Sequence, residues 1–171
     1  MKTNLLISIV ILTLLSACNS PKKEVTNHSN PLEGSWKMQE IHYIYTDTTY
    51  VGKPITYGTF VFAPKRYSLL YNPWTTERKA FDTLSKPTDA EIKAAFQSIV
   101  FNSGSYIYTD STVTTTADMA KVPGFEGGQQ FYTYTIKNDM LDIMMFDETY
   151  PDGNKPEWYG KLKVLFKMKK E

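Results

Sequence analysis

Cysteine and histidine are almost absent from this chain, and their scarcity excludes several classes of protein. The 171 residues contain one cysteine, Cys18, so no disulfide can form within the chain and its stability must come from packing. The two histidines, His28 and His42, form no cluster with cysteine at a zinc-ligand spacing. No Gly-x-Ser-x-Gly elbow is present, and no glycine-rich phosphate loop precedes a helix. We therefore expect no metal site, no cofactor and no enzymatic activity.

An excess of charge of one sign is also lacking. Lysine and arginine total 19 and aspartate and glutamate total 18, and the only arginines are Arg66 and Arg78. Nucleic-acid binding needs a basic face, so we expect no nucleic-acid partner. Aromatic residues, by contrast, make up 14% of the chain, with 12 tyrosines and 9 phenylalanines. Such amphipathic rings at strand spacing favour a sheet with one buried face.

The N-terminus carries one apolar run, residues 5–17, which follows Lys2 and is too short to span a bilayer. The run ends in Leu15-Ser16-Ala17-Cys18, which resembles the bacterial lipobox. In that motif the cysteine thiol receives a diacylglycerol and the chain is cut just before it. The resemblance implies a signal peptide over 1–17 and a lipid anchor on Cys18. A secreted protein with a chance cysteine is the alternative.

The segment that follows the cysteine is polar. Residues 19–32 contain two prolines and are typical of a flexible tether, with a mean reach of roughly 20 Å. Asn19 directly after the cysteine resembles the bacterial sorting signal for the outer membrane. We therefore expect residues 18–32 to hold a domain over 33–171 in the envelope of a Gram-negative bacterium, at the outer membrane.

Beyond residue 33, short alternating segments and turn signals follow one another. We expect eight strands, over 34–46, 56–63, 66–71, 105–109, 112–119, 129–137, 140–147 and 158–169. In the first of them Trp36 and Met38 share one face, whereas the apolar pattern of Ile41 and Tyr43 has the other phase. This change of phase predicts a β-bulge.

One helix interrupts the strands. Thr88 and Glu91 form a capping box before an apolar run with helical spacing, made by Ile92, Ala95, Phe96 and Ile99. The pattern predicts a helix over about 89–99. A helix this short is not stable alone, so we expect it to dock on an apolar surface.

Eight hairpin-linked strands in so small a chain favour closure, because closure removes exposed sheet edges. The predicted fold class is all-β, an antiparallel up-and-down β-barrel of about eight strands with one short helix inserted after the third strand. A β-sandwich is the alternative.

A set of short motifs in this order resembles the lipocalins and the bacterial lipocalin-like domains. The motifs are Gly34-x-Trp36, Gly58-x-Phe60, the return strand 67–71, the capped helix and Gly104-Ser105-Tyr106. The resemblance covers 33–169 and implies a lipocalin-like barrel.

The same resemblance assigns roles at the closed end of the barrel. It implies that Gly34 lets the chain enter tightly and that Trp36 plugs this end. An arginine of the last strand often covers this tryptophan in such domains. Here Lys167 or Lys169 is expected in its place.

In a small barrel one face of every strand points inward. The expected inner lining consists of Tyr43, Phe60, Phe62, Tyr106, Tyr108, Tyr132, Tyr134, Met144 and Phe146. A tyrosine joins an apolar ring to a polar tip, which suits a planar or amphipathic ligand. The alternative is that these rings fill the barrel and leave no cavity.

Three functions remain open. The resemblance favours an envelope-anchored protein, held to the membrane through Cys18, that binds a small, partly apolar ligand. The second is a filled barrel whose outer surface, around Trp74 and Trp158, binds an envelope protein or a glycan. The weakest is an isomerase or cyclase with a tyrosine or His42 as acid and base. The acidic residues over 147–157 do not fit a calcium loop and are interpreted as a solvated turn.

Overall fold

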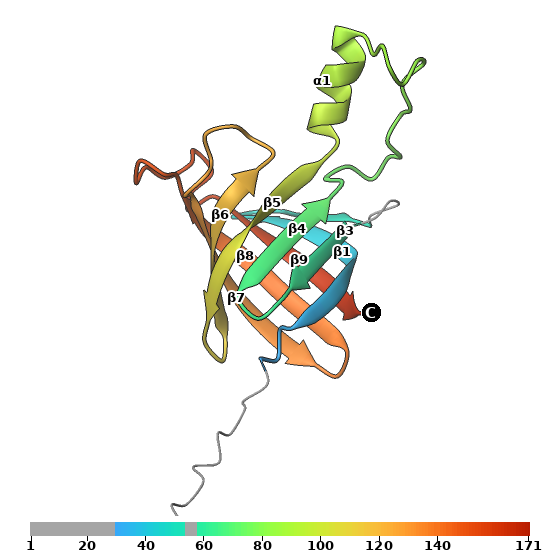
Figure 1. The fold of residues 1–171 in the computed structure, drawn as a ribbon. Coiled ribbons are helices and arrows are strands. Elements are labelled where there is room, and N and C mark those ends of the chain that lie inside the picture. Colours follow the sequence, from blue (N-terminus) through green and yellow to red (C-terminus); the bar gives the residue numbers. More distant parts are fainter. Residues whose placement is uncertain (1–29, 54–57) are drawn as a thin grey trace, which may run out of the picture.

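A computed structural model describes residues 30–53 and 58–171 as one antiparallel barrel (Figure 1). Its elements are β1 Gly34–Tyr45, β2 Thr49–Gly52, β3 Gly58–Phe62, β4 Arg66–Tyr71, α1 Asp89–Gln97, β5 Val100–Tyr108, β6 Thr112–Ala120, β7 Gln129–Lys137, β8 Met140–Thr149 and β9 Leu162–Lys170. Eight strands follow one another in the order β1-β3-β4-β5-β6-β7-β8-β9, and β9 pairs back with β1. The predicted closed barrel is therefore confirmed.

The helix follows the fourth strand, not the third, because the sequence prediction missed β2. This strand has four residues, three of them exposed, so it carries no inside-outside alternation. It pairs only with the second half of β1, where His42 lies opposite Val51. Because β2 flanks the ring of eight strands, its presence leaves the closure of the barrel unchanged.

Three register shifts interrupt the described strands, and the one in the β7–β8 pair is taken up with the candidate site. The first is a register shift between Met38 and Glu40 in the β1–β9 pair, where the change of phase predicts it. The second lies between Ser103 and Gly104 in the β5–β6 pair. At Gly104 a Cβ atom would stand 1.9 Å from the carbonyl oxygen of Thr116, so only glycine fits there. This glycine lies inside β5, whereas the sequence prediction began the strand after it.

The two ends of the barrel differ in the length of their connections. Short turns over 63–65, 109–111 and 138–139 close one end, which also receives the chain at residue 30. The long connections over 72–99, 121–128 and 150–161 gather at the other end. Figure 1 shows α1 projecting from this second end, away from the short turns. We name the two ends the closed end and the open end.

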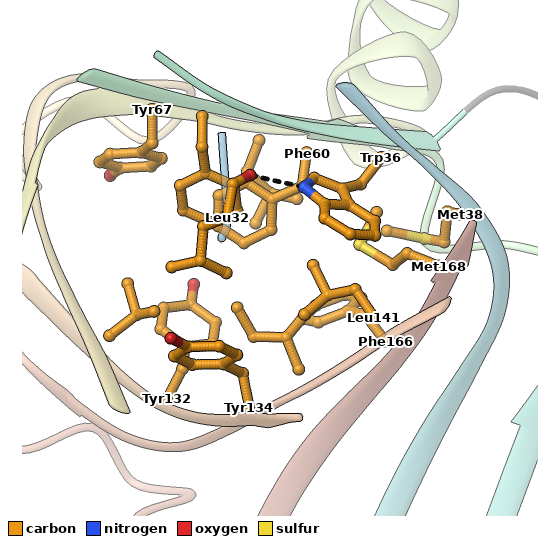
Figure 2. Close-up of a cluster of buried hydrophobic side chains, with 14 of the residues drawn as sticks. Leu32, Trp36, Met38, Phe60, Tyr67, Tyr132, Tyr134, Leu141, Phe166 and Met168 are labelled. Carbon is orange, nitrogen blue, oxygen red and sulfur yellow. Dashed lines mark hydrogen bonds between the residues drawn. The ribbon is translucent and has the colours of Figure 1, made fainter. Parts of the chain in front are cut away.

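Trp36 plugs the closed end, as the family resemblance implies. Its side chain is fully buried, and its indole Nε1 donates a hydrogen bond to the carbonyl oxygen of Leu32 at 2.7 Å (Figure 2). The cation over the ring is Lys170, with Nζ 5.2 Å from the ring centroid. The expectation of Lys167 or Lys169 was wrong, because the register of β1 and β9 places Lys170 opposite Trp36.

The helix begins with the predicted capping box but does not dock. Thr88 accepts from the backbone of Glu91 and the Glu91 side chain accepts from the backbone of Thr88, while no residue of α1 is buried. Ile92 and Phe96 are 50% and 46% exposed. Polar contacts hold α1 instead, including the bond from the Trp74 indole to the carbonyl oxygen of Gln97 at 2.9 Å. The apolar face of α1 is therefore free of the barrel.

Candidate functional site

Most of the side chains predicted to line the barrel point into it. Phe60, Phe62, Tyr106, Tyr132 and Tyr134 belong to the buried core cluster, and Tyr43 is partly buried against it. Figure 2 shows several of these rings projecting from the surrounding strands into one interior. Tyr108 follows Tyr106 on β5 but lies at the rim and is 40% exposed.

Met144 and Phe146 lie on the outside of the barrel, so their assignment to the inner lining was wrong. Leu141 and Ile143 are fully buried, so Met144, which lies between Ile143 and Met145, takes the outward phase. A register shift follows in the β7–β8 pair, where Tyr132 lies opposite Met145 and Phe131 lies opposite Asp147. Phe146 has no partner in this register, and Met145 takes the inward position against the core. Met144 and Phe146 instead line a shallow outer hollow of about 370 Å³.

The closed half of the interior is filled and its tyrosine hydroxyls are engaged. The Tyr106 hydroxyl donates to the carbonyl oxygen of Ala63, and the Tyr134 hydroxyl donates to the carbonyl oxygen of Thr109, both at 2.8 Å. Phe60 and Phe62 stack with ring centroids 4.3 Å apart. These contacts fix the short turns to the core, so we interpret the closed half as structural.

A polar network lies on the inner face nearer the open end. The Tyr132 hydroxyl donates to Oε1 of Gln130 at 2.8 Å, and Nε2 of Gln130 donates to Oε2 of Glu148 at 2.7 Å. Nδ2 of Asn102 also reaches Oε1 of Gln130, at 3.3 Å. Gln130 and Glu148 are opposite one another in the β7–β8 register and so share the inner face.

Two further tyrosines of β4 belong to this site, which we name the interior polar cluster. It consists of Tyr67, Tyr71, Asn102, Gln130, Tyr132 and Glu148. Tyr67 and Tyr71 are buried, and the charge of Glu148 acts on both. Figure 2 shows the rings of Tyr67 and Tyr132 reaching into the interior from different strands.

Burial shifts the ionisation of the whole cluster. It raises the pKa of Glu148 above its ordinary value of 4.5; the hydrogen bond from Gln130 opposes this and the charge of Asp147 adds to it. Burial raises the pKa of Tyr67 to about 12, and also raises the pKa of Tyr71 and of Tyr132. The tyrosine hydroxyls therefore stay protonated at neutral pH. The cluster offers hydroxyl groups and one carboxyl group to a ligand.

The raised pKa of Glu148 predicts a pH-dependent effect of Glu148→Gln. A carboxyl group whose folded-state pKa is raised supports the fold below its unfolded pKa, and this support is lost as pH rises through the folded-state pKa. Glutamine keeps an acceptor for Gln130 and carries no charge. The free energy of unfolding of the variant, relative to the wild type, is therefore expected to increase between pH 4 and pH 7. Urea denaturation at several pH values measures it, and a constant or falling difference would contradict the burial of this carboxyl group.

His42 lies on the outer face of β1 and is unsuited to chemistry inside the barrel. Its Nε2 is 2.9 Å from Oε2 of Glu40, and this hydrogen bond lowers the pKa of Glu40. The acidic residues near 147–157 are also separated, since Asp147 pairs with Lys155 at 2.6 Å while Glu148 points inward. Within 30–53 and 58–171, no group of three or more His, Cys, Asp or Glu residues is arranged to hold a metal ion.

The sequence prediction did not single out the polar members of the cluster. Gln130 alternates with Tyr132 and Tyr134 along β7, so the inward phase of this strand already contained it. Glu148 was assigned to a solvated turn, because the predicted strand ended at residue 147 and other acidic residues follow it. The structure extends β8 to Thr149, and its bulge places Glu148 opposite Gln130. Only the register of β7 against β8 brings the two side chains together.

The N-terminal predictions fall outside the described residues. The signal peptide over 1–17, the lipid anchor on Cys18 and most of the tether over 18–32 therefore stay predictions. No helix in the part of the chain that the structure describes is long and apolar enough to cross a membrane.

The comparison with known families agrees with the geometry. The sequence model of a family described as a lipocalin-like domain matches residues 33–160, which span β1 to the loop before β9. A search of the curated proteins gives no match.

Proposed function

The chain belongs to the lipocalin-like domain family, whose barrels are in general ligand-binding scaffolds, and from this premise we propose that it binds a small, partly apolar molecule in the open half of its barrel. The ligand would enter between the long connections of the open end. It would rest on the interior polar cluster, and the barrel would bind it without converting it.

The interior polar cluster is the observation that carries this proposal. A barrel that served only as a packed scaffold gains nothing from a carboxyl group in its interior, because a buried polar group is costly unless it is fully bonded. Here the bonded hydroxyl groups of Tyr106 and Tyr134 mark the closed half, and Gln130 and Glu148 mark the open half. An apolar interior with a few polar groups at one end is typical of a ligand pocket, in which the polar groups orient a mostly apolar molecule.

We also propose that Cys18 anchors the protein in the bacterial envelope, at the outer membrane. The described chain begins at Asn30, beside the closed end. A tether from Cys18 would therefore present the closed end to the membrane and leave the open end facing away from it. This orientation supports ligand uptake from the surrounding compartment.

A second candidate function is favoured by the exposed apolar groups outside the barrel. Trp74 is 56% exposed beside α1, whereas Trp158 is partly buried. A hollow of about 340 Å³ lies between the segment 74–79 and the end of α1. In this alternative, a partner protein or a glycan of the envelope binds the surface around Trp74.

A matched pair of methionine variants distinguishes the two functions. Met145 faces the interior and Met144 faces outward on the same strand. With the neutral fluorophore N-phenyl-1-naphthylamine as probe, we expect saturable binding that Met145→Ala weakens by at least about fivefold, or roughly 1 kcal/mol. Met144→Ala is expected to leave the affinity within about twofold. The absence of saturable binding, or an equal loss in both variants, would contradict the proposal.

A further inference from the structure

The carboxylates of β8 differ in how their charge is balanced. The outward-facing Asp142 and Asp147 each have a lysine partner, Lys167 at 3.2 Å and Lys155 at 2.6 Å. The inward-facing Glu148 has none among residues 30–53 and 58–171, where its hydrogen-bond partner is the neutral amide of Gln130. The strand therefore neutralises its outer carboxylates and leaves the inner one unpaired.

The surroundings of Glu148 make this imbalance costly. Burial raises the pKa of the carboxyl group, and the one charged neighbour that acts on it, Asp147, has the same sign. An ionised group in such a place is destabilising unless a counter-charge arrives. Without a counter-charge the carboxyl group is favoured in its protonated form. No lysine or arginine of the described residues forms an ion pair with Glu148, so a cation carried by a ligand would stabilise its ionised form.

The aromatic rings around Glu148 suit a positive charge as well. Tyr67, Tyr71 and Tyr132 lie near the carboxylate, and the faces of their π-systems attract cations. Below them, Phe60 packs edge-on against Tyr132 at 5.9 Å and Phe166 packs against Tyr71 at 5.4 Å. These rings form an apolar layer beside the polar cluster, and Figure 2 shows Phe60, Phe166 and Tyr132 within the interior.

We propose that the ligand of the open half is a small organic amine, whose ammonium group pairs with the Glu148 carboxylate while its apolar body packs on the tyrosine and phenylalanine rings. The inference rests on the proposed function and names the chemical class of its ligand. An anionic ligand would meet the carboxylate with no cation of the described interior beside it.

Three probes with one naphthyl body test the inference by calorimetric titration of the full-length chain. They are 2-(1-naphthyl)ethylamine, 2-(1-naphthyl)ethanol and 1-naphthylacetate, which carry a cation, a neutral hydroxyl group and an anion. We expect the amine to bind at least about tenfold more tightly than the alcohol, as for a charge-assisted contact, and the acetate to bind most weakly. Equal affinity for amine and alcohol would overturn the inference and leave the proposed function standing. Binding of none of the three would overturn both.

Two isosteric variants test whether the tighter binding of the amine depends on Glu148. Glu148→Gln is expected to weaken binding of the amine by about tenfold and to leave the alcohol within about twofold. Asp147→Asn, which changes the adjacent outward carboxylate, is expected to leave both affinities within about twofold. An equal loss for amine and alcohol in Glu148→Gln would indicate a structural role and overturn the inference. If this variant does not fold, the order of affinities of the three probes for the wild type decides whether the inference holds.

Discussion

Replacement of Trp36 by alanine is expected to lower the free energy of unfolding by about 3–5 kcal/mol, the range for large aromatic side chains in cores. The ring is fully buried at the closed end, so its removal leaves a cavity that short turns cannot fill. The bond from its indole to Leu32 and the contact with Lys170 are lost as well. Because small domains are stable by only about 5–15 kcal/mol, this single change removes a large share of the stability.

Urea denaturation measures this loss, and a second tryptophan provides the control. Trp74 is 56% exposed, and Trp74→Ala is expected to cost about 1 kcal/mol or less. If Trp36→Ala cost no more than Trp74→Ala, Trp36 would not plug the barrel. The closed end would then be defined by its short turns alone.

Gly104→Ala is expected to destabilise the domain by about 3 kcal/mol, at the upper end of the range for overpacking. The new Cβ atom would stand 1.9 Å from the carbonyl oxygen of Thr116 and 2.9 Å from the backbone nitrogen of Asp118. Both are backbone atoms, so no side-chain rotation relieves the overlap. The β5–β6 pair would have to separate at its bulge.

Gly52→Ala in β2 is the matched control, since the nearest atom to its Cβ is a methyl carbon of Thr75 at 3.5 Å. Its effect is expected to be within about 0.5 kcal/mol. Thermal or urea unfolding of both variants gives the comparison. A stable Gly104→Ala protein with wild-type unfolding would contradict the close approach of β5 and β6.

The closed barrel could be predicted from the sequence because alternation and hairpin turns are local signals. The strand Leu162–Lys170 shows how: Val164, Phe166 and Met168 are buried, as their spacing indicates. β2 could not be predicted, because its side chains are mostly exposed and show no alternation. It is identified as a strand by its pairing with β1, which the sequence does not reveal. The helix α1 was predicted correctly, but its docking on an apolar surface was not. Its apolar face follows the helical period, but the barrel offers it no docking surface.

Errors at the candidate site come from the phase of β8 and from its bulge. Both phases of β8 are apolar over Met144, Met145 and Phe146, so the sequence does not show which of them faces inward. The register shift at Phe131 and Tyr132 then turns Glu148 inward. The bulge of β1 is visible in the sequence as a change of phase, whereas the bulge of β8 is not, because apolar residues occupy both phases of that strand. The interior polar cluster therefore emerges only from the three-dimensional structure.

The central claim is that a ligand binds inside the open half of the barrel, and methyl NMR of the methionines tests it most directly. The chain has 7 methionines. The methyl signal of Met145 reports on the inside of β8, and that of Met144 reports on its outside. On titration with 2-(1-naphthyl)ethylamine, the account predicts a saturating shift of the Met145 methyl signal while those of Met144 and of Met168 at the closed end stay in place. A shift of Met144 with Met145 unmoved would place the ligand on the outer surface and contradict the account.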